Sequence, residues 1–169
     1  MSLKVFSVVG FSGSGKTTTI ELLIPELKKR GFRVGTVKEI HNEAFALDAN
    51  PNGNTARHRA AGAELVVARG LRETDVMFPE KLEMERILLF FEGFDYAILE
   101  GVRDIDVPLV AAADCEARLE DIWSEHVFCV SGRVADGLGQ YKGIPAISAI
   151  GEAAGLADCV ERYFKARRP

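Results

Sequence analysis

Residues 8–18 read Val8-Val9-Gly10-Phe11-Ser12-Gly13-Ser14-Gly15-Lys16-Thr17-Thr18, and this stretch is the strongest indication of the fold class. It fills the pattern G-x-x-x-x-G-K-[ST], follows an apolar run at residues 3–9, and precedes a segment with helical periodicity. Glycines let successive backbone N–H groups turn toward an anion, and the following helix adds the partial positive charge of its first turn. The stretch therefore predicts a P-loop. The residues expected to bind nucleotide phosphates are Gly10, Ser12, Gly13, Ser14, Gly15, Lys16, Thr17 and Thr18.

Two side chains of this loop have expected chemical roles. Lys16 supplies a positive charge to the β- and γ-phosphates, so we assign it to catalysis as well as binding. The Thr17 hydroxyl is an expected ligand of Mg²⁺. The alternative is a Gly- and Ser-rich turn that matches by chance, which the intact Lys-Thr pair and the flanking strand and helix disfavour.

Length and composition favour one domain, residues 1–169, with an ordinary hydrophobic core. The chain has 169 residues, 47% hydrophobic and 27% charged. Its net charge of −4 gives no global case for nucleic-acid binding. No apolar stretch is long enough to span a membrane, and no signal peptide precedes the first strand, so we expect a cytoplasmic protein.

Strand and helix patterns alternate along the chain, which predicts an α/β fold: a three-layer P-loop NTPase with a mostly parallel sheet flanked by helices. An extended hairpin arm is expected at residues 69–81, and a loop at residues 39–54 is either a phosphate-sensing segment or a plain surface loop. The expected strands are residues 3–9, 33–37, 64–68, 96–99, 107–112, 127–130 and 145–150. The expected helices are residues 16–30, 55–61 with Thr55 as N-cap, 82–91 and 151–166.

The run Asp95-Tyr96-Ala97-Ile98-Leu99-Glu100-Gly101 has the form of a Walker B strand. Its apolar residues carry Glu100 to the edge of the sheet beside the P-loop, where the carboxylate can hold Mg²⁺ or orient a water molecule. We expect Glu100 to be catalytic and, with Thr17, to bind the metal. A solvated glutamate at a strand end is the alternative.

The residues that bind the nucleobase and a second ligand are harder to predict from the sequence. No Asn-Lys-x-Asp motif for guanine occurs, and the segments expected nearest the base are Ser131-Gly132-Arg133 and the residues after Ile147. A second, anionic ligand is expected near the strand ends, although a solvated helix face explains the arginines at positions 57 and 59 equally well. The candidate residues for that ligand are Lys38, His41, Arg57, His58 and Arg103.

Several segments together resemble the molybdopterin-guanine dinucleotide biosynthesis protein B family (MobB). They are the P-loop with its strand, Thr36-Val37-Lys38, Arg57-His58-Arg59-Ala60-Ala61-Gly62-Ala63 and Leu99-Glu100-Gly101. The resemblance covers about the first two-thirds of the chain. It implies a GTP-binding, weakly GTP-hydrolysing protein that assists the nucleotidyltransferase joining GMP to molybdopterin, and that is usually a homodimer.

The chain departs from that family at two points. Glu39 and Ile40 stand between Thr36-Val37-Lys38 and His41, where the family commonly has further histidines. Gly53-Asn54-Thr55 replaces a G-K-D-[ST] turn, so Asp48 or Glu100 is expected to take the metal role of the missing aspartate.

Two other functions remain open from the residues. A small-molecule kinase would need an Arg-rich lid, and the segment after Glu100 offers only Arg103. A nucleotide switch or metallochaperone-like GTPase would favour Cys/His clusters, and the three cysteines show no such spacing.

Overall fold

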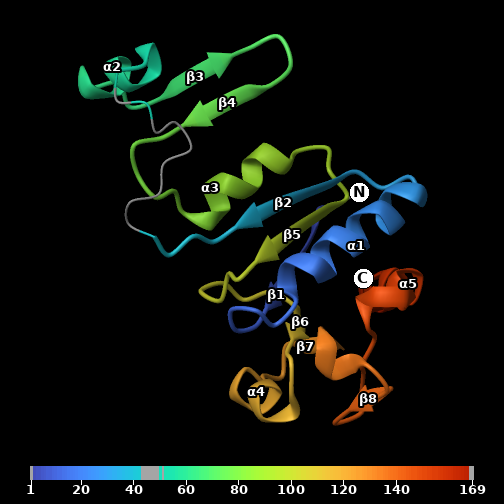
Figure 1. Cartoon of the computed structure of the whole chain (residues 1–169). Helices are drawn as coiled ribbons and strands as arrows, with labels where there is room; N and C mark the ends of the chain where they lie inside the picture. The colour runs from blue at the N-terminus through green and yellow to red at the C-terminus, as the bar shows by residue number, and fades with distance from the viewer. Residues whose placement is uncertain (1, 43–49, 51, 168–169) are drawn as a thin grey trace. The chain divides into compact units, whose positions relative to one another are not determined.

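The computed structural model describes residues 2–42, 50 and 52–167 (Figure 1). Contacts divide the chain into two compact units, Met1–Glu39 with Phe91–Pro169, and Ile40–Phe90. Each unit is described by itself, and the single-domain organisation stays a prediction. The described helices are all too short or too polar to span a bilayer.

The first unit is built on a five-stranded sheet in the order β2-β5-β1-β6-β7 (Figure 1). All four strand pairings are parallel, which confirms the predicted sheet. The strands are β1 (Lys4–Val9), β2 (Val34–Lys38), β5 (Tyr96–Glu100), β6 (Leu109–Ala112) and β7 (Val127–Ser131). Because the strands are parallel, all their carboxyl ends meet at one edge, where the loop after β1 carries the P-loop.

Alternate residues of the strands face two different helical layers. Val110 and Ala112 of β6 pack in the cluster that contains the apolar faces of α1 (Lys16–Lys29) and α5 (Ala149–Ala166). Ala111 faces the other side, in the cluster that contains Leu119 of α4 (Glu116–Asp121). This two-residue period makes the first unit a three-layer α/β/α sandwich, as the sequence predicts.

The predicted last strand, residues 145–150, is wrong. Two short strands, β8 (Gln140–Tyr141) and β9 (Ile144–Pro145), pair with each other instead, and only Ala146 bridges to the main sheet, at Val130. Lys142 and Gly143 both have positive φ, at 48° and 79°. Such a two-residue turn folds the flanking residues back as a tight hairpin, which ends the extended run early.

The second unit contains α2 (Asn54–Ala60) and an antiparallel pair, β3 (Val66–Arg69) and β4 (Thr74–Met77). A hairpin therefore exists, but its first strand is the one predicted at residues 64–68, so it does not lie wholly within residues 69–81 as expected. Thr55 is not the N-cap, because α2 begins at Asn54 with Gly53 in that position. The helix expected at residues 82–91 is shorter: α3 (Met84–Leu88) ends in the 3₁₀ turn η1 (Leu89–Phe91), a common way for a helix to tighten at its end.

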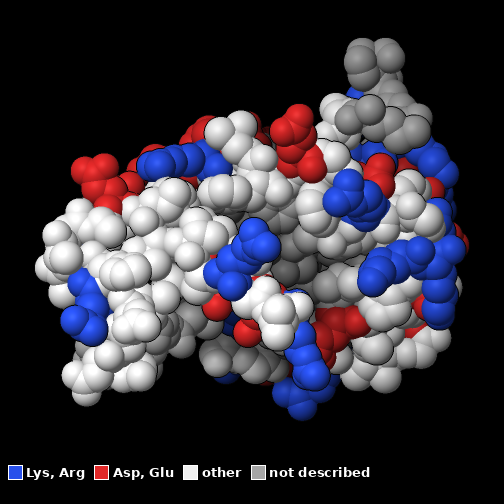
Figure 2. All heavy atoms as spheres, turned by 90° about the horizontal axis from the view of Figure 1, so that it is seen from above, with Lys and Arg blue, Asp and Glu red and all other residues white. Residues whose placement is uncertain are grey.

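Charge is mixed over the one face of the molecule that Figure 2 draws. The face drawn in Figure 2 carries both positive and negative side chains, and a broad part of it carries neither.

Candidate functional site

The P-loop connects β1 to α1 and packs against the end of β6. A Cβ atom on Gly10 would lie 2.2 Å from the Ala112 carbonyl oxygen and 2.4 Å from Ser14 Oγ, so only glycine fits there. Gly15 has φ of 96° and serves as the N-cap of α1. The first N–H groups of a helix have no acceptor within the helix, so the loop presents donors to an anion.

The Lys16 ammonium lies folded over its own loop. Its Nζ donates to the carbonyl oxygens of Gly10 at 3.1 Å and Phe11 at 2.8 Å. Burial lowers the pKa of Lys16, the nearby charges of Arg103 and Lys38 lower it further, and Glu100 partly opposes the shift. Three positive groups, Lys16, Lys38 and Arg103, thus face the one carboxylate of Glu100, and a phosphate group would add balancing negative charge.

Glu100 lies where the Walker B pattern predicts, at the carboxyl end of β5. Strand register places it opposite Val8 of β1 and Lys38 of β2. Its Oε1 accepts hydrogen bonds from Thr17 Oγ1 at 2.7 Å and Lys38 Nζ at 3.0 Å. Burial alone would raise the pKa of Glu100, but the hydrogen bonds from Thr17 and Lys38 and the charges of Lys38 and Lys16 bring it below its usual value.

The donor set suits a small hard cation that also binds phosphate. The Thr17 hydroxyl and the Glu100 carboxylate are both oxygen ligands of the kind Mg²⁺ prefers, and they lie together beside the P-loop. Across the residues described, no three His, Cys, Asp or Glu side chains gather as a metal cluster. An ion held here would therefore need phosphate or water oxygens as well. Asp48, the other candidate ligand, lies outside the described residues.

A cavity of about 200 Å³ adjoins the P-loop on the side of β7. Both segments predicted to lie nearest the base contribute to it. Gly132, with φ of 79°, approaches so closely that a Cβ there would lie 2.5 Å from the Ser14 carbonyl oxygen. Thr19 Oγ1 and Ser131 Oγ lie 3.3 Å apart and tie α1 to the end of β7. The cavity is lined by Gly13, Gly15, Thr18, Thr19, Gly132, Arg133, Asp136, Ser148, Ala149 and Ile150.

The family model described as "Molybdopterin guanine dinucleotide synthesis protein B" matches residues 5–126. The chain belongs to this MobB family. Membership ties it to molybdopterin-guanine dinucleotide biosynthesis, which confirms the resemblance noted in the sequence.

Curated relatives and solved structures agree with the family. A probable molybdopterin-guanine dinucleotide biosynthesis adapter protein of Bacillus subtilis is 22% identical over 147 residues, 86% of this chain and 85% of that protein. The adapter protein of Escherichia coli is 26% identical over 171 residues, 96% and 94% of the two chains. The crystal structure of Bacillus subtilis MobB has a TM-score of 0.70 at 22% identity, over 96% of each chain. A MobB homologue from Bacillus stearothermophilus has a TM-score of 0.69 at 21% identity, over 94% of this chain and 98% of the other.

The residues proposed for a second ligand fall into two groups. Lys38 and Arg103 lie in the first unit, and their charges act on Lys16. His41, Arg57 and His58 lie in the second unit, so their part in the same site stays a prediction.

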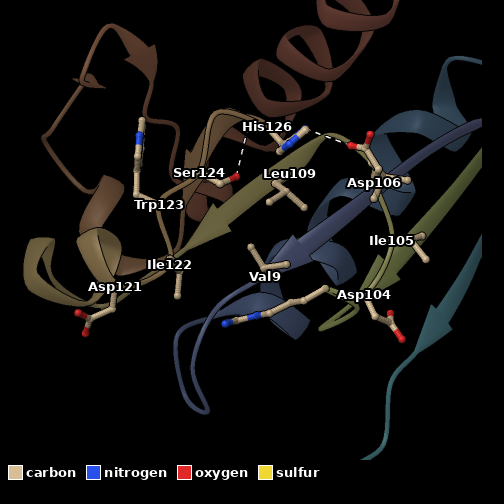
Figure 3. Close-up of a pocket in the computed structure, with 12 residues that line it drawn as sticks. Val9, Asp104, Ile105, Asp106, Leu109, Asp121, Ile122, Trp123, Ser124 and His126 are labelled. Atoms are coloured by element: carbon tan, nitrogen blue, oxygen red, sulfur yellow. Dashed lines mark hydrogen bonds and ion pairs between the residues drawn. The ribbon is translucent and has the colours of Figure 1, made fainter.

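Arg103 also lines a cavity of about 530 Å³ over the face of β1 and β6. Val9, Leu109 and Ile122 supply apolar walls, and His126 Nδ1 lies 3.3 Å from Asp106 Oδ1 at the rim (Figure 3).

Sequence reasoning missed Asp136, which lines the smaller cavity, whereas Ser148 falls in the segment after Ile147 that was expected near the base. Neither belongs to a recognisable motif. Asp136 follows the end of β7 by five residues, and Ser148 immediately precedes α5. The only available signal was topological: residues just beyond the carboxyl ends of parallel strands face the ligand edge of the sheet.

Proposed function

We propose that this MobB-family chain is a GTP-binding adapter that hydrolyses GTP slowly and assists a separate nucleotidyltransferase in making molybdopterin-guanine dinucleotide. The observation that carries the proposal is the contact between Thr17 of the P-loop and Glu100 of β5, 2.7 Å long, in a chain of this family. It joins the two halves of a triphosphate site.

The chain's own groups account for binding. The P-loop N–H groups and the N-terminus of α1 favour an anion, and Lys16 adds a full positive charge. Thr17 and Glu100 would hold Mg²⁺, which when bound neutralises charge on the phosphates.

Slow hydrolysis is expected because few fixed positive groups are available to stabilise the charge of the transition state. An arginine held against the transferring phosphoryl group raises the rate by about 10³–10⁵. The loop after Glu100 offers Arg103, whose side chain is exposed. A group that is not fixed in place must be ordered at the moment of reaction, so it contributes much less than a preorganised one.

The adapter role also requires surfaces for partners. Val67 and Val76 are opposite each other on the β3–β4 hairpin and are 52% and 48% exposed. Exposed apolar groups of this kind are typical of protein interfaces. We propose that they support a homodimer, and expect Val67→Lys to shift the sedimentation coefficient toward a monomer while GTP affinity is retained.

The larger cavity favours one alternative, a small-molecule kinase. Arg103 lines that cavity and also lies near Lys16, so an anionic acceptor bound there would approach the phosphate end of the P-loop.

Reconstitution distinguishes the two functions. A nucleotidyltransferase of this pathway, molybdopterin and GTP are incubated with the wild-type chain, with Lys16→Ala, or with neither. The adapter proposal expects more dinucleotide with wild type than with the variant, and slow GTP loss without any acceptor. No rise in dinucleotide, or rapid phosphorylation of a small acceptor by this chain alone, contradicts it.

A further inference from the structure

We propose that the cavity beside β7 is the nucleobase pocket and that the Asp136 carboxylate selects guanine within it. This inference rests on the proposed function, because it assumes a nucleoside triphosphate on the P-loop. The family match ends at residue 126, so every β7-side residue of this cavity lies beyond it.

Strand order gives the bound nucleotide a direction. The P-loop follows the central strand β1, and the Thr17, Lys38 and Glu100 cluster lies toward β5 and β2 on one side. That side takes the metal and the terminal phosphate. The cavity lies on the other side, toward β7, two strands or about 10 Å from β1. A nucleotide with its phosphates on the loop therefore places its base toward the cavity.

The size and walls of the cavity suit a flat bicyclic base. Its volume of about 200 Å³ is below the ~300–1,000 Å³ of pockets that enclose a whole drug-sized ligand. Ile150 gives an apolar wall and is 66% exposed. Arg133 also lines the cavity, and a guanidinium plane stacks well on an aromatic ring.

The polar groups of the pocket match guanine better than adenine. An ionised aspartate only accepts hydrogen bonds, and guanine offers two adjacent donors, N1–H and the 2-amino group, on its pairing edge. Adenine presents an acceptor at N1, which a carboxylate repels. Ser148 also lines the cavity, and a serine hydroxyl can donate a hydrogen bond to the guanine O6.

Titration calorimetry on the full chain with Mg²⁺ tests the assignment, using GTP, ATP and xanthosine triphosphate as ligands. Asp136→Asn is the variant, and Asp121→Asn, an exposed aspartate of α4, is the matched control. Asp136 is itself exposed, so the change should leave folding intact.

The expected result is that Asp136→Asn lowers the affinity for GTP about 10- to 100-fold and does not lower the affinity for ATP. Binding of xanthosine triphosphate should improve, because xanthine carries a carbonyl where guanine carries the 2-amino group and the new amide can donate to it. Asp121→Asn should match wild type for all three.

Two results overturn the assignment in different ways. If wild type binds GTP and Asp136→Asn binds it equally well, Asp136 does not read the base, while the proposed function stands. If wild type binds none of the three triphosphates, the proposed function fails and the pocket assignment fails with it.

Discussion

The two ends of the proposed nucleotide site are built differently. At the end formed by β5 and β2, Thr17, Lys38 and Glu100 are joined by hydrogen bonds of 2.7 and 3.0 Å and lie within or next to recognisable motifs. At the β7 end, separate segments contribute Gly132, Asp136 and the start of α5, and no motif marks any of them.

That difference reflects the chemistry of the two ligand parts. Phosphate and Mg²⁺ demand backbone N–H groups, a lysine and oxygen ligands in one arrangement, so the sequence pattern is narrow. A base is flat and neutral, and many combinations of an acceptor, a donor and a stacking wall can bind it. The phosphate end can therefore be predicted from a local sequence motif, whereas the base end can be predicted only from the order of the strands.

The largest effect is expected at the β7 end, from Gly132→Ala. A Cβ there would lie 2.5 Å from the Ser14 carbonyl oxygen and 2.6 Å from that of Ala113, and the backbone has φ of 79°. Left-handed strain and overpacking together should lower the free energy of unfolding by about 2–5 kcal/mol, measured by urea denaturation.

Gly137→Ala is the matched control. Gly137 has nearly the same φ, 78°, but nothing lies within 4 Å of its Cβ position, so only the backbone strain should appear. Equal losses of unfolding free energy in the two variants would show that the loop after β7 is not tightly packed against the P-loop. That result would argue against a direct contact between the two ends of the site.

Lys16→Ala should give the next largest effect, at the phosphate end. Loss of a charge-assisted contact should weaken triphosphate binding about 10- to 150-fold, measured by calorimetry. Affinity for GTP and for ATP should fall equally, because in the proposed orientation the ammonium contacts the phosphates and not the base.

The exposed Lys28 of α1, changed to alanine, provides the control and should bind both nucleotides as wild type does. A loss in Lys16→Ala that falls on GTP alone would contradict the assigned direction of the nucleotide.

Prediction from sequence succeeded where a local pattern fixes the geometry. The apolar run before Gly10 gave β1, and the apolar run before Glu100 gave β5, because buried parallel strands are continuous hydrophobic segments. It failed at residues 145–150, where the turn at Lys142 and Gly143 outweighs an apolar run. Asp136 was missed for another reason: its position matters only after β7 is placed beside β6.

Glu100→Gln should have a moderate effect confined to the metal. Removing the charge should weaken the affinity for Mg²⁺, measured through GTP hydrolysis, about 10- to 100-fold. Nucleotide binding without Mg²⁺ should change little. The measurement is a Mg²⁺ titration of hydrolysis, with the exposed Glu92→Gln as control. If the variant hydrolyses GTP as fast as wild type and with the same Mg²⁺ dependence, Glu100 is only a solvated residue at a strand end and has no metal role.

Lys38→Met should have the smallest effect, since Lys38 is 57% exposed and its contact with Glu100 is screened by solvent. The pKa of Glu100 lies below its usual value in the folded protein, so the stabilisation from this contact is present above the unfolded-state value and is lost as pH falls through the folded one. Wild type should therefore exceed Lys38→Met in stability by less than about 1 kcal/mol near pH 7, and the difference should disappear once the pH is below the folded-state pKa of Glu100. Denaturation over a pH series from neutral to acid measures it, and a carboxyl NMR titration should show the pKa of Glu100 rising in the variant. A difference that persists at acid pH would mean that Lys38 acts through packing of its stem instead of through the Glu100 charge, leaving Thr17 to hold that carboxylate at the metal end.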